Sequence, residues 1–142
     1  MSRTALRPPA HLTIGQLARQ GGVHLETIRY YERRGLIPRP PRTGAGYRLF
    51  PLETVRRVRF IKRAQALGFS LREVKDLLAL RARSDATCDN VEARAAAKIG
   101  DIDAKLQHLT AMRRALTGLI ASCRRRAGSA PCPILDSLGS ND

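Results

Sequence analysis

The spacing of apolar residues predicts a pair of short helices near the start of the chain. In residues 13–20, and again in residues 24–35, apolar side chains recur on one helical face. Gly21 and Gly22 lie between the two segments and permit a tight turn, because glycine tolerates backbone angles that other residues avoid. The pattern therefore predicts a helix-turn-helix, although a two-helix hairpin without any DNA-binding role has the same pattern.

Prolines and glycines interrupt the helical spacing after residue 35. Prolines exclude helix over residues 36–42, and Gly44 and Gly46 favour a turn. Residues 47–50 then have the aromatic and apolar character of a short strand. The sequence predicts a small basic hairpin, or wing, beside the helix-turn-helix; an ordinary surface loop is the alternative.

Helical spacing resumes in two further segments. The first spans residues 52–67 and is ended by Gly68, and the second spans residues 70–81. Ser70 and Glu73 have the spacing of a capping box at the start of the second segment. Residues 84–87 then separate this half of the chain from the next.

One long helix is predicted over residues 89–123, with Asp89 and Glu92 as a capping box. Apolar residues in it follow alternating steps of four and three, which is typical of a coiled-coil seam and calls for a partner helix. Packing against the protein's own N-terminal helices is the alternative. The tail is predicted to begin as a loop and to finish with a turn of helix through Leu138. The seam positions are Cys88, Glu92, Ala95, Ile99, Ile102, Leu106, Leu109, Arg113, Leu116, Ile120 and Cys123.

Composition agrees with a mainly helical protein, because only 4% of residues are aromatic and none is Trp. The 142 residues carry 26 Lys or Arg and 12 Asp or Glu, a net charge of +14. Residues 1–87 hold 18 basic and 6 acidic side chains, whereas residues 88–142 hold 8 and 6. The first half therefore has the charge to bind a polyanion, and nucleic acid is the leading candidate.

Donor side chains on the outward face of the second helix and on the wing can contact bases and phosphates. A basic cluster on the third helix adds to the same charged surface, although such clusters are often simply solvated. The candidate DNA-binding residues are Arg19, Thr27, Arg29, Tyr30, Arg33, Arg42, Arg48, Lys62 and Arg63.

Membrane and secretory signals are not seen. No apolar run approaches the roughly 20 residues of a membrane span, and residues 1–10 lack the apolar core of a signal peptide. We therefore expect a cytoplasmic protein that does not bind membranes. The three cysteines are odd in number and form no CxxC pair, so a closed disulfide framework or a zinc finger is excluded.

Cys88 and Cys123 lie 35 residues apart, which is five heptads, so both belong to the same seam. A helix of that length separates them by about 52 Å, and they cannot meet within one chain. A parallel dimer would place each cysteine against its own copy. An antiparallel dimer would place Cys88 against Cys123 of the partner twice, keeping most of the seam apolar, and Cys132 could fold back as a third sulfur.

Three thiolates without a His or carboxylate ligand favour a soft ion, since structural zinc normally takes four ligands. The sequence therefore predicts two identical three-thiolate metal sites across a dimer interface, formed by Cys88, Cys123 and Cys132. Three inert buried thiols are the alternative.

Five segments resemble the MerR family of transcription regulators, and the resemblance runs from about residue 12 to 138. The Cys-Pro-Ile-Leu sequence at residues 132–135 is similar to the mercury-responsive branch. Residues 124–130 depart from that branch, where a His is often found, and the clustered cysteines of the iron–sulfur branch are lacking. The segments are Thr13-Ile14-Gly15-Gln16-Leu17-Ala18, Glu26-Thr27-Ile28-Arg29-Tyr30-Tyr31-Glu32, Tyr47-Arg48, Arg57-Val58-Arg59-Phe60-Ile61 and Leu67-Gly68-Phe69-Ser70-Leu71.

The resemblance implies an antiparallel homodimer with one winged helix-turn-helix on each half of a palindromic operator. It implies repression without metal, and activation with metal through bending and untwisting of promoter DNA so that RNA polymerase can engage. Cys88, Cys123 and Cys132 would bind Hg(II), one from one subunit and two from the other. Lead- and cadmium-responsive relatives use three similarly placed cysteines, so Pb(II), Cd(II) or Zn(II) are alternative inducers.

The expected organisation has four parts: a disordered segment (1–11), a winged helix-turn-helix domain (12–83), a linker with the dimerisation helix (84–123), and a metal-binding loop with the tail (124–142). A thiol enzyme is disfavoured, because the chain has no CxxC pair, no glycine-rich nucleotide loop and no base near a cysteine. A general architectural nucleic-acid binder and a metal-free thiol redox regulator remain alternatives.

Overall fold

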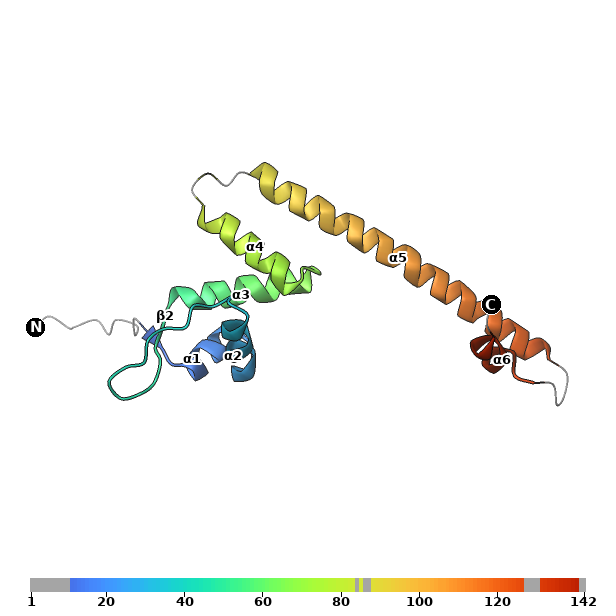
Figure 1. The fold of residues 1–142 in the computed structure, drawn as a ribbon, viewed down its shortest axis with the longest axis horizontal. Helices are drawn as coiled ribbons and strands as arrows, with labels where there is room; N and C mark the ends of the chain where they lie inside the picture. The colour runs from blue at the N-terminus through green and yellow to red at the C-terminus, as the bar shows by residue number, and fades with distance from the viewer. Residues whose placement is uncertain (1–10, 84, 86–87, 127–130, 141–142) are drawn as a thin grey trace, which may run out of the picture. The chain divides into compact units, whose positions relative to one another are not determined.

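The computed structural model describes residues 11–83, 85, 88–126 and 131–140. This part of the chain contains six helices and one two-stranded sheet, so the expectation of a mainly helical protein is confirmed (Figure 1). The chain forms two compact units, Met1–Glu92 and Ala93–Asp142. Residues 1–10, most of the joint at 84–87 and loop residues 127–130 lie outside the described part, and with them the predictions made there.

The first unit begins with the predicted helix-turn-helix, formed by α1 (Ile14–Gly21) and α2 (Leu25–Arg33). Thr13 and Gln16 close a capping box at the start of α1, so the first free amides of the helix are satisfied. Gly22 ends α1 with a φ of 70°, a left-handed conformation that glycine adopts without steric cost. These local signals explain why the chain turns where it does.

Two further helices complete this unit, α3 (Glu53–Ala66) and α4 (Leu71–Ala82), close to the predicted bounds. The predicted capping box at the start of α4 is present, with the Ser70 hydroxyl accepting from the Glu73 amide at 3.2 Å. Figure 1 shows α1 and α2 against α3. The core they share is apolar and includes Leu17, Ile28, Tyr31, Leu36, Val58, Ile61 and Val74.

The short strand expected at residues 47–50 is placed differently in the structure. The strand is β2 (Phe50–Pro51), and it pairs antiparallel with β1 (His11–Leu12) rather than within the wing. The pairing sets Leu12 opposite Phe50, and both side chains are buried in the core, which explains why the sheet forms there. His11 is thus ordered, one residue inside the segment expected to be disordered.

The wing itself, residues 42–48, is a hairpin-like loop closed by one isolated bridge between Arg42 and Arg48. Within it the amide of Thr43 donates to the carbonyl of Tyr47 at 2.7 Å. Gly46 has a φ of 91°, which only glycine adopts readily, so the tight turn depends on this residue. The expectation of a basic hairpin beside the helix-turn-helix is confirmed, but with a bridge in place of a strand.

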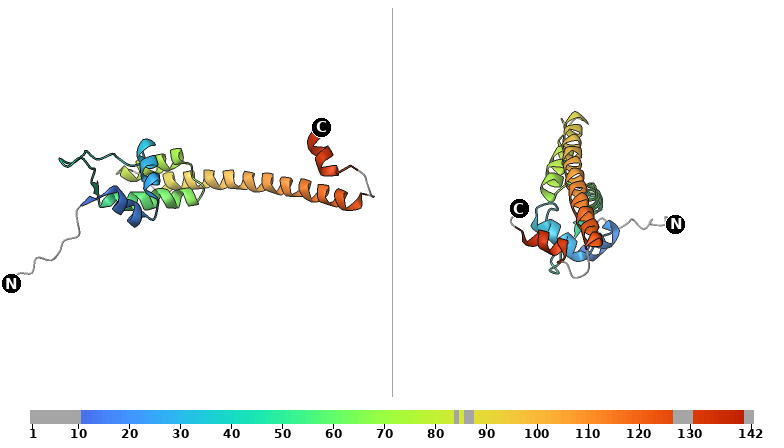
Figure 2. Two further views of the ribbon diagram at one scale, coloured as in Figure 1. Left: turned by 90° about the horizontal axis from the view of Figure 1, so that it is seen from below. Right: turned by 90° about the vertical axis from the view of Figure 1, so that its right-hand side faces the viewer.

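The long helix, α5, spans Cys88–Arg125, and Figure 2 shows it as one unbroken helix. It begins one residue earlier and ends two residues later than expected, so Asp89 lies in its first turn and is not the cap. The large apolar residues of the predicted seam are exposed along this helix: Ile99, Ile102, Leu106, Leu109, Leu116 and Ile120. In the described residues, no helix is both long and apolar enough to cross a membrane.

The chain finishes with α6 (Pro133–Gly139), a short helix in place of the single turn expected near Leu138. Cys132 is its N-cap residue, and Pro133 occupies the first helical position, where its missing amide costs nothing. Cys132 therefore lies immediately before the first turn of α6.

Candidate nucleic-acid interface and thiol pair

The second helix of the helix-turn-helix is held by its inner face, which leaves its outer face free. Ile28 and Tyr31 of α2 are buried in the core. The Tyr31 hydroxyl donates to the Gln65 side-chain oxygen of α3 at 2.8 Å. Burial raises the pKa of Tyr31, so the hydroxyl stays protonated and remains a donor. This anchor fixes which side chains α2 presents outward.

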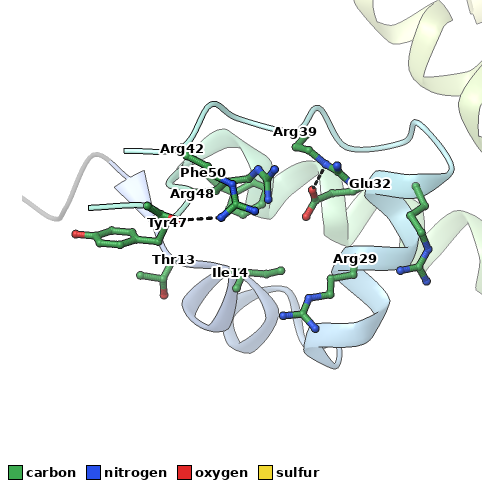
Figure 3. A pocket seen from close by; sticks show the side chains of 11 residues that line it. Thr13, Ile14, Arg29, Glu32, Arg39, Arg42, Tyr47, Arg48 and Phe50 are labelled. Atoms are coloured by element: carbon green, nitrogen blue, oxygen red, sulfur yellow. Dashed lines mark hydrogen bonds and ion pairs between the residues drawn. The ribbon is translucent and has the colours of Figure 1, made fainter. Parts of the chain in front are cut away.

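A hollow of about 460 Å³ lies between α2 and the wing, and we refer to it as the basic hollow (Figure 3). Five arginines line it, two from α2, one from the linker after α2 and two from the wing. Against them stands one carboxylate among its described lining residues, that of Glu32. The basic hollow is lined by Thr13, Ile14, Arg29, Glu32, Arg33, Arg39, Arg42, Gly46, Tyr47, Arg48 and Phe50.

The arginines of the basic hollow are only partly engaged with the protein. Arg29 forms an ion pair with Glu26 at 2.8 Å, and both side chains are more than half exposed. Arg42 donates to the Gly46 carbonyl at 2.8 Å, which holds its guanidinium against the turn of the wing. The arginines make this site strongly positive, which suits contact with a phosphate backbone.

The structure brings together four of the candidate DNA-binding residues, namely Arg29, Arg33, Arg42 and Arg48. Tyr30 lies beside them on the exposed side of α2, with the guanidinium carbons of Arg33 and Arg34 each 5.9 Å from its ring centre. Such stacking limits the motion of the two arginines.

The other candidates lie away from the hollow. Thr27 is half-buried in α2, and Arg19 and Arg63 are exposed on α1 and α3. Lys62 donates to the Gly22 carbonyl at 2.7 Å, beyond the end of α1, so part of its role is to hold the turn between α1 and α2.

Sequence reasoning missed three residues that line the hollow: Glu32, Arg39 and Tyr47. Arg39 is flanked by prolines in the linker between α2 and the wing, and Tyr47 is 53% exposed on the wing. The signal for Arg39 was its position between two elements already expected to contact DNA, and the signal for Tyr47 was its position on one of them. The sequence contains no such signal for Glu32. Only the fold shows that it lies near arginines that belong to the linker and the wing.

The second candidate site is a thiol pair formed by Cys123, near the end of α5, and Cys132, the N-cap of α6. Their sulfurs lie 3.8 Å apart. A disulfide would bring them to about 2.05 Å, so both are free thiols. The backbone amides of Leu135 and Ile134, the Cys123 thiol and the charge of Arg126 lower the pKa of Cys132. Its thiolate, the form that binds metals, is thereby favoured.

The thiol pair has a spacing that one soft ion could bridge. Two thiolates sharing an ion at about 2.3 Å each, with tetrahedral or trigonal angles, lie about 3.8–4.0 Å apart. The structure does not bring Cys88 to this pair, because Cys88 begins α5 and Cys123 lies near its other end. Among the described residues of one chain, no three His, Cys, Asp or Glu side chains are grouped to hold a metal.

The first unit, with its helix-turn-helix, its wing and the basic hollow between them, defines a winged helix-turn-helix protein of the DNA-binding class. Residues 12–80 match the family described as MerR HTH family regulatory protein, and residues 55–119 match the one described as MerR, DNA binding. The chain belongs to the MerR family of transcription regulators.

Relatives of this chain include proteins named for metals. The mercuric resistance operon regulatory protein of Bacillus cereus is 45% identical over 88% of this chain and 95% of its own length. The dual-function regulator MerR of Bacillus megaterium MB1, solved in complex with mercury(II), is 40% identical with a TM-score of 0.70, over 91% of this chain and 100% of that one.

A transcription regulator solved with lead(II) is comparably similar. PbrR691 of Ralstonia metallidurans CH34, solved in complex with lead(II), is 36% identical with a TM-score of 0.78, over 90% of this chain and 99% of that one. The structural likeness to the lead complex is thus as extensive as the likeness to the mercury complex, whereas sequence identity is slightly higher for the latter.

Proposed function

We propose that this protein is a cytoplasmic, metal-responsive transcription regulator that senses Hg(II). In this proposal two copies form an antiparallel homodimer on a palindromic operator, with one winged helix-turn-helix on each half. Without metal the dimer represses, and with metal it distorts the promoter DNA so that RNA polymerase can engage. The relatives named for mercuric resistance support the choice of ion.

The observation that carries the proposal is the thiol pair, with two sulfurs 3.8 Å apart at the junction of α5 and α6. Two thiolates at that spacing suit one soft cation, and no carboxylate or imidazole is needed. Cys88 of the partner subunit would add the third sulfur, since an antiparallel seam sets residue 88 opposite residue 123. Each dimer would then hold two identical sites.

The ion would act by shifting the equilibrium between two arrangements of the dimer. Binding at a shared site ties the end of one α5 to the start of the other, so the ion favours the arrangement in which the three sulfurs meet. A ligand shifts such an equilibrium only by its difference in affinity for the two states. Each winged helix-turn-helix is joined to an α5, so the angle between the two DNA-binding domains would change as well and would distort the operator.

Two alternatives rest on specific observations. The relative solved with lead(II) keeps Pb(II) open as the inducer, and Cd(II) and Zn(II) belong to the same choice. A peroxide could instead oxidise the same thiol pair to a disulfide while it is itself reduced to water, which would make the protein a metal-free redox regulator. The two classes differ in stoichiometry, because only a metal sensor retains an ion.

The first testable prediction concerns ion selectivity. We expect Hg(II) to bind at two ions per dimer under reducing conditions and to activate a reporter at lower concentration than Pb(II), Cd(II) or Zn(II). The measurement is a titration of each ion by reporter and gel shift, with metal content determined by mass spectrometry. Induction by peroxide without bound metal would favour the redox alternative.

The matched variants for this titration are Cys88→Ser, Cys123→Ser and Cys132→Ser. Each should bind operator DNA like the wild type and lose induction, because removal of one thiolate leaves the ion too few soft ligands. Ser122→Ala, one residue from the thiol pair, serves as the control and should keep both properties. Normal induction in all three cysteine variants would contradict the metal site.

A further inference from the structure

Glu32 is a buried carboxylate in a site otherwise lined by cations. Its side chain is 5% exposed, and it lies on α2 facing the basic hollow with its five arginines. Carboxylates are rarely buried unless they are paired. In a surface that attracts phosphate, a carboxylate opposes binding unless it orients a neighbouring side chain that binds phosphate.

The neighbour it contacts is Arg39. The Nε of Arg39 donates to Glu32 Oε2 at 3.2 Å, while the Arg39 side chain remains 56% exposed (Figure 3). A bond through Nε leaves the two terminal nitrogens of a guanidinium available for a second partner. Glu32 is therefore the buried member of the pair, and Arg39 the member that can reach outward.

The prolines beside Arg39 stiffen its backbone but supply no amide hydrogen that could bond this segment to α2. Pro38 and Pro40 flank Arg39, and neither has an amide hydrogen to donate. No helix or strand includes this linker, which runs from α2 to the wing. The ion pair with Glu32 thus joins α2 to the segment that leads into the wing.

We propose that Arg39 is a DNA phosphate contact and that Glu32 is its positioning residue. Glu32 holds the guanidinium through Nε, so that the terminal nitrogens face the duplex before it arrives. Such preorganisation reduces the entropy lost when the contact forms. This inference rests on the DNA-binding part of the proposed function, and it assigns a role to two residues that the sequence did not single out.

The proposal and simple electrostatics predict opposite signs for Glu32→Gln. Removal of a negative charge beside a phosphate should by itself tighten binding. If Glu32 positions Arg39, the same substitution weakens binding, by about three- to tenfold, because a neutral amide oxygen accepts from Nε less strongly than a carboxylate does. The salt dependence should stay the same, because Arg39 keeps its charge.

The experiment measures binding of the full-length protein to a linear duplex of random sequence over a series of salt concentrations. Arg39→Gln should weaken binding and reduce the slope of log K against log salt by about 0.9, the value for one phosphate contact. Arg39→Lys should also weaken binding, because lysine cannot bond Glu32 and a phosphate through one planar group. Glu32→Gln should have no further effect in the Arg39→Gln background.

Two results would overturn the inference: unchanged or tighter binding by Glu32→Gln, or an effect of that variant that persists when Arg39 is already Gln. Thermal unfolding of each variant tests whether weaker binding reflects a loss of folded protein or the loss of one contact. Partial unfolding would also change the slope of log K against log salt. Failure of the wild type to bind any duplex would instead overturn the proposed function.

Discussion

At the scale of single residues, Cys132 illustrates how neighbours prepare a thiol for a soft ion. Two backbone amides, the Cys123 thiol and the charge of Arg126 lower its pKa, so the thiolate is populated at a lower pH than in an unfolded chain. Metal binding must displace the proton of a thiol, so a lowered pKa reduces that competition.

This shift predicts a pH dependence of Cys132 alkylation. In the folded protein the midpoint of the rate against pH should lie below that of the same residue in denaturant, because a lowered pKa gives more thiolate at each pH beneath the usual value. Iodoacetamide labelling, quantified on the peptide that carries Cys132, measures both midpoints. Coincident midpoints would show that the fold does not activate this thiol.

Another prediction concerns two arginines of the basic hollow, Arg29 on α2 and Arg48 on the wing. Arg29→Ala and Arg48→Ala should each weaken operator binding and flatten its salt dependence by about 0.9 in log–log slope, as loss of one phosphate contact requires. Arg114→Ala, an exposed arginine on α5, is the control for a change of net charge alone. Gel shifts over a salt series provide the measurement, and slopes equal to the wild type would contradict the assignment of these two arginines as phosphate contacts.

Residues of this kind were only partly predictable. Arg29 and Arg48 follow from position, because an outward helix face and a basic hairpin can be identified from spacing. The Glu32–Arg39 pair and the bond from Arg57 to the Leu36 carbonyl could not, since both depend on where a proline-rich linker returns against a helix. Burial and the charge of Arg81 lower the pKa of Arg57, another effect that no local pattern contains.

At the scale of elements, the packing of α1 on α3 depends on a glycine at the end of α1. A Cβ added to Gly21 would lie 2.6 Å from Cγ1 of Val58, a fully buried branched side chain with no room to move. Gly15, in the first turn of the same helix, has nothing within 4 Å of an added Cβ. The two positions therefore differ in packing, while both lie in α1.

We expect Gly21→Ala to destabilise the protein by about 1–3 kcal/mol, the usual cost of overpacking a core. Gly15→Ala should be neutral or stabilise by about 0.5 kcal/mol, since alanine favours helix over glycine. Urea unfolding of both variants measures the difference. Equal stabilities would mean that the helices separate without cost.

Most elements were predictable because their signals are local: helical spacing, the capping box before α4, and glycines at turns. The sheet was not, because β1 and β2 are two residues each and join segments far apart in sequence. Their pairing depends on the burial of Leu12 and Phe50, and strands this short have no alternating apolar pattern that would predict them. The two ends of α5 were slightly misplaced, since helix ends depend on caps more than on periodicity.

At the scale of the whole molecule, the exposed apolar face of α5 is where the proposed homodimer would pair, and the orientation of the two chains can be tested directly. In an antiparallel pair the seam sets Leu106 opposite Leu106 of the partner and Cys123 far from its own copy. In a parallel pair both residues face their copies. Cross-linking at these two positions therefore distinguishes the arrangements.

The prediction uses a chain in which all three cysteines are Ser and Leu106→Cys is added. Oxidation should cross-link this variant into dimers, visible on a non-reducing gel, because the two side chains meet at the centre of the seam. The matched control retains Cys123 as its only cysteine and should not be cross-linked by the same oxidation, so it should run on the gel as a single chain. Cross-linking of both would indicate parallel chains.

The apolar face of α5 also bears on the concentration of this protein that a cell needs for the proposed dimer to form. Where two copies cover that face for each other, the folded dimer gains stability by mass action, and its melting temperature rises with protein concentration. A regulator present in few copies therefore has a lower limit of abundance below which its dimers dissociate. The tightness of the seam sets that limit, and so sets how sparingly the protein can be made.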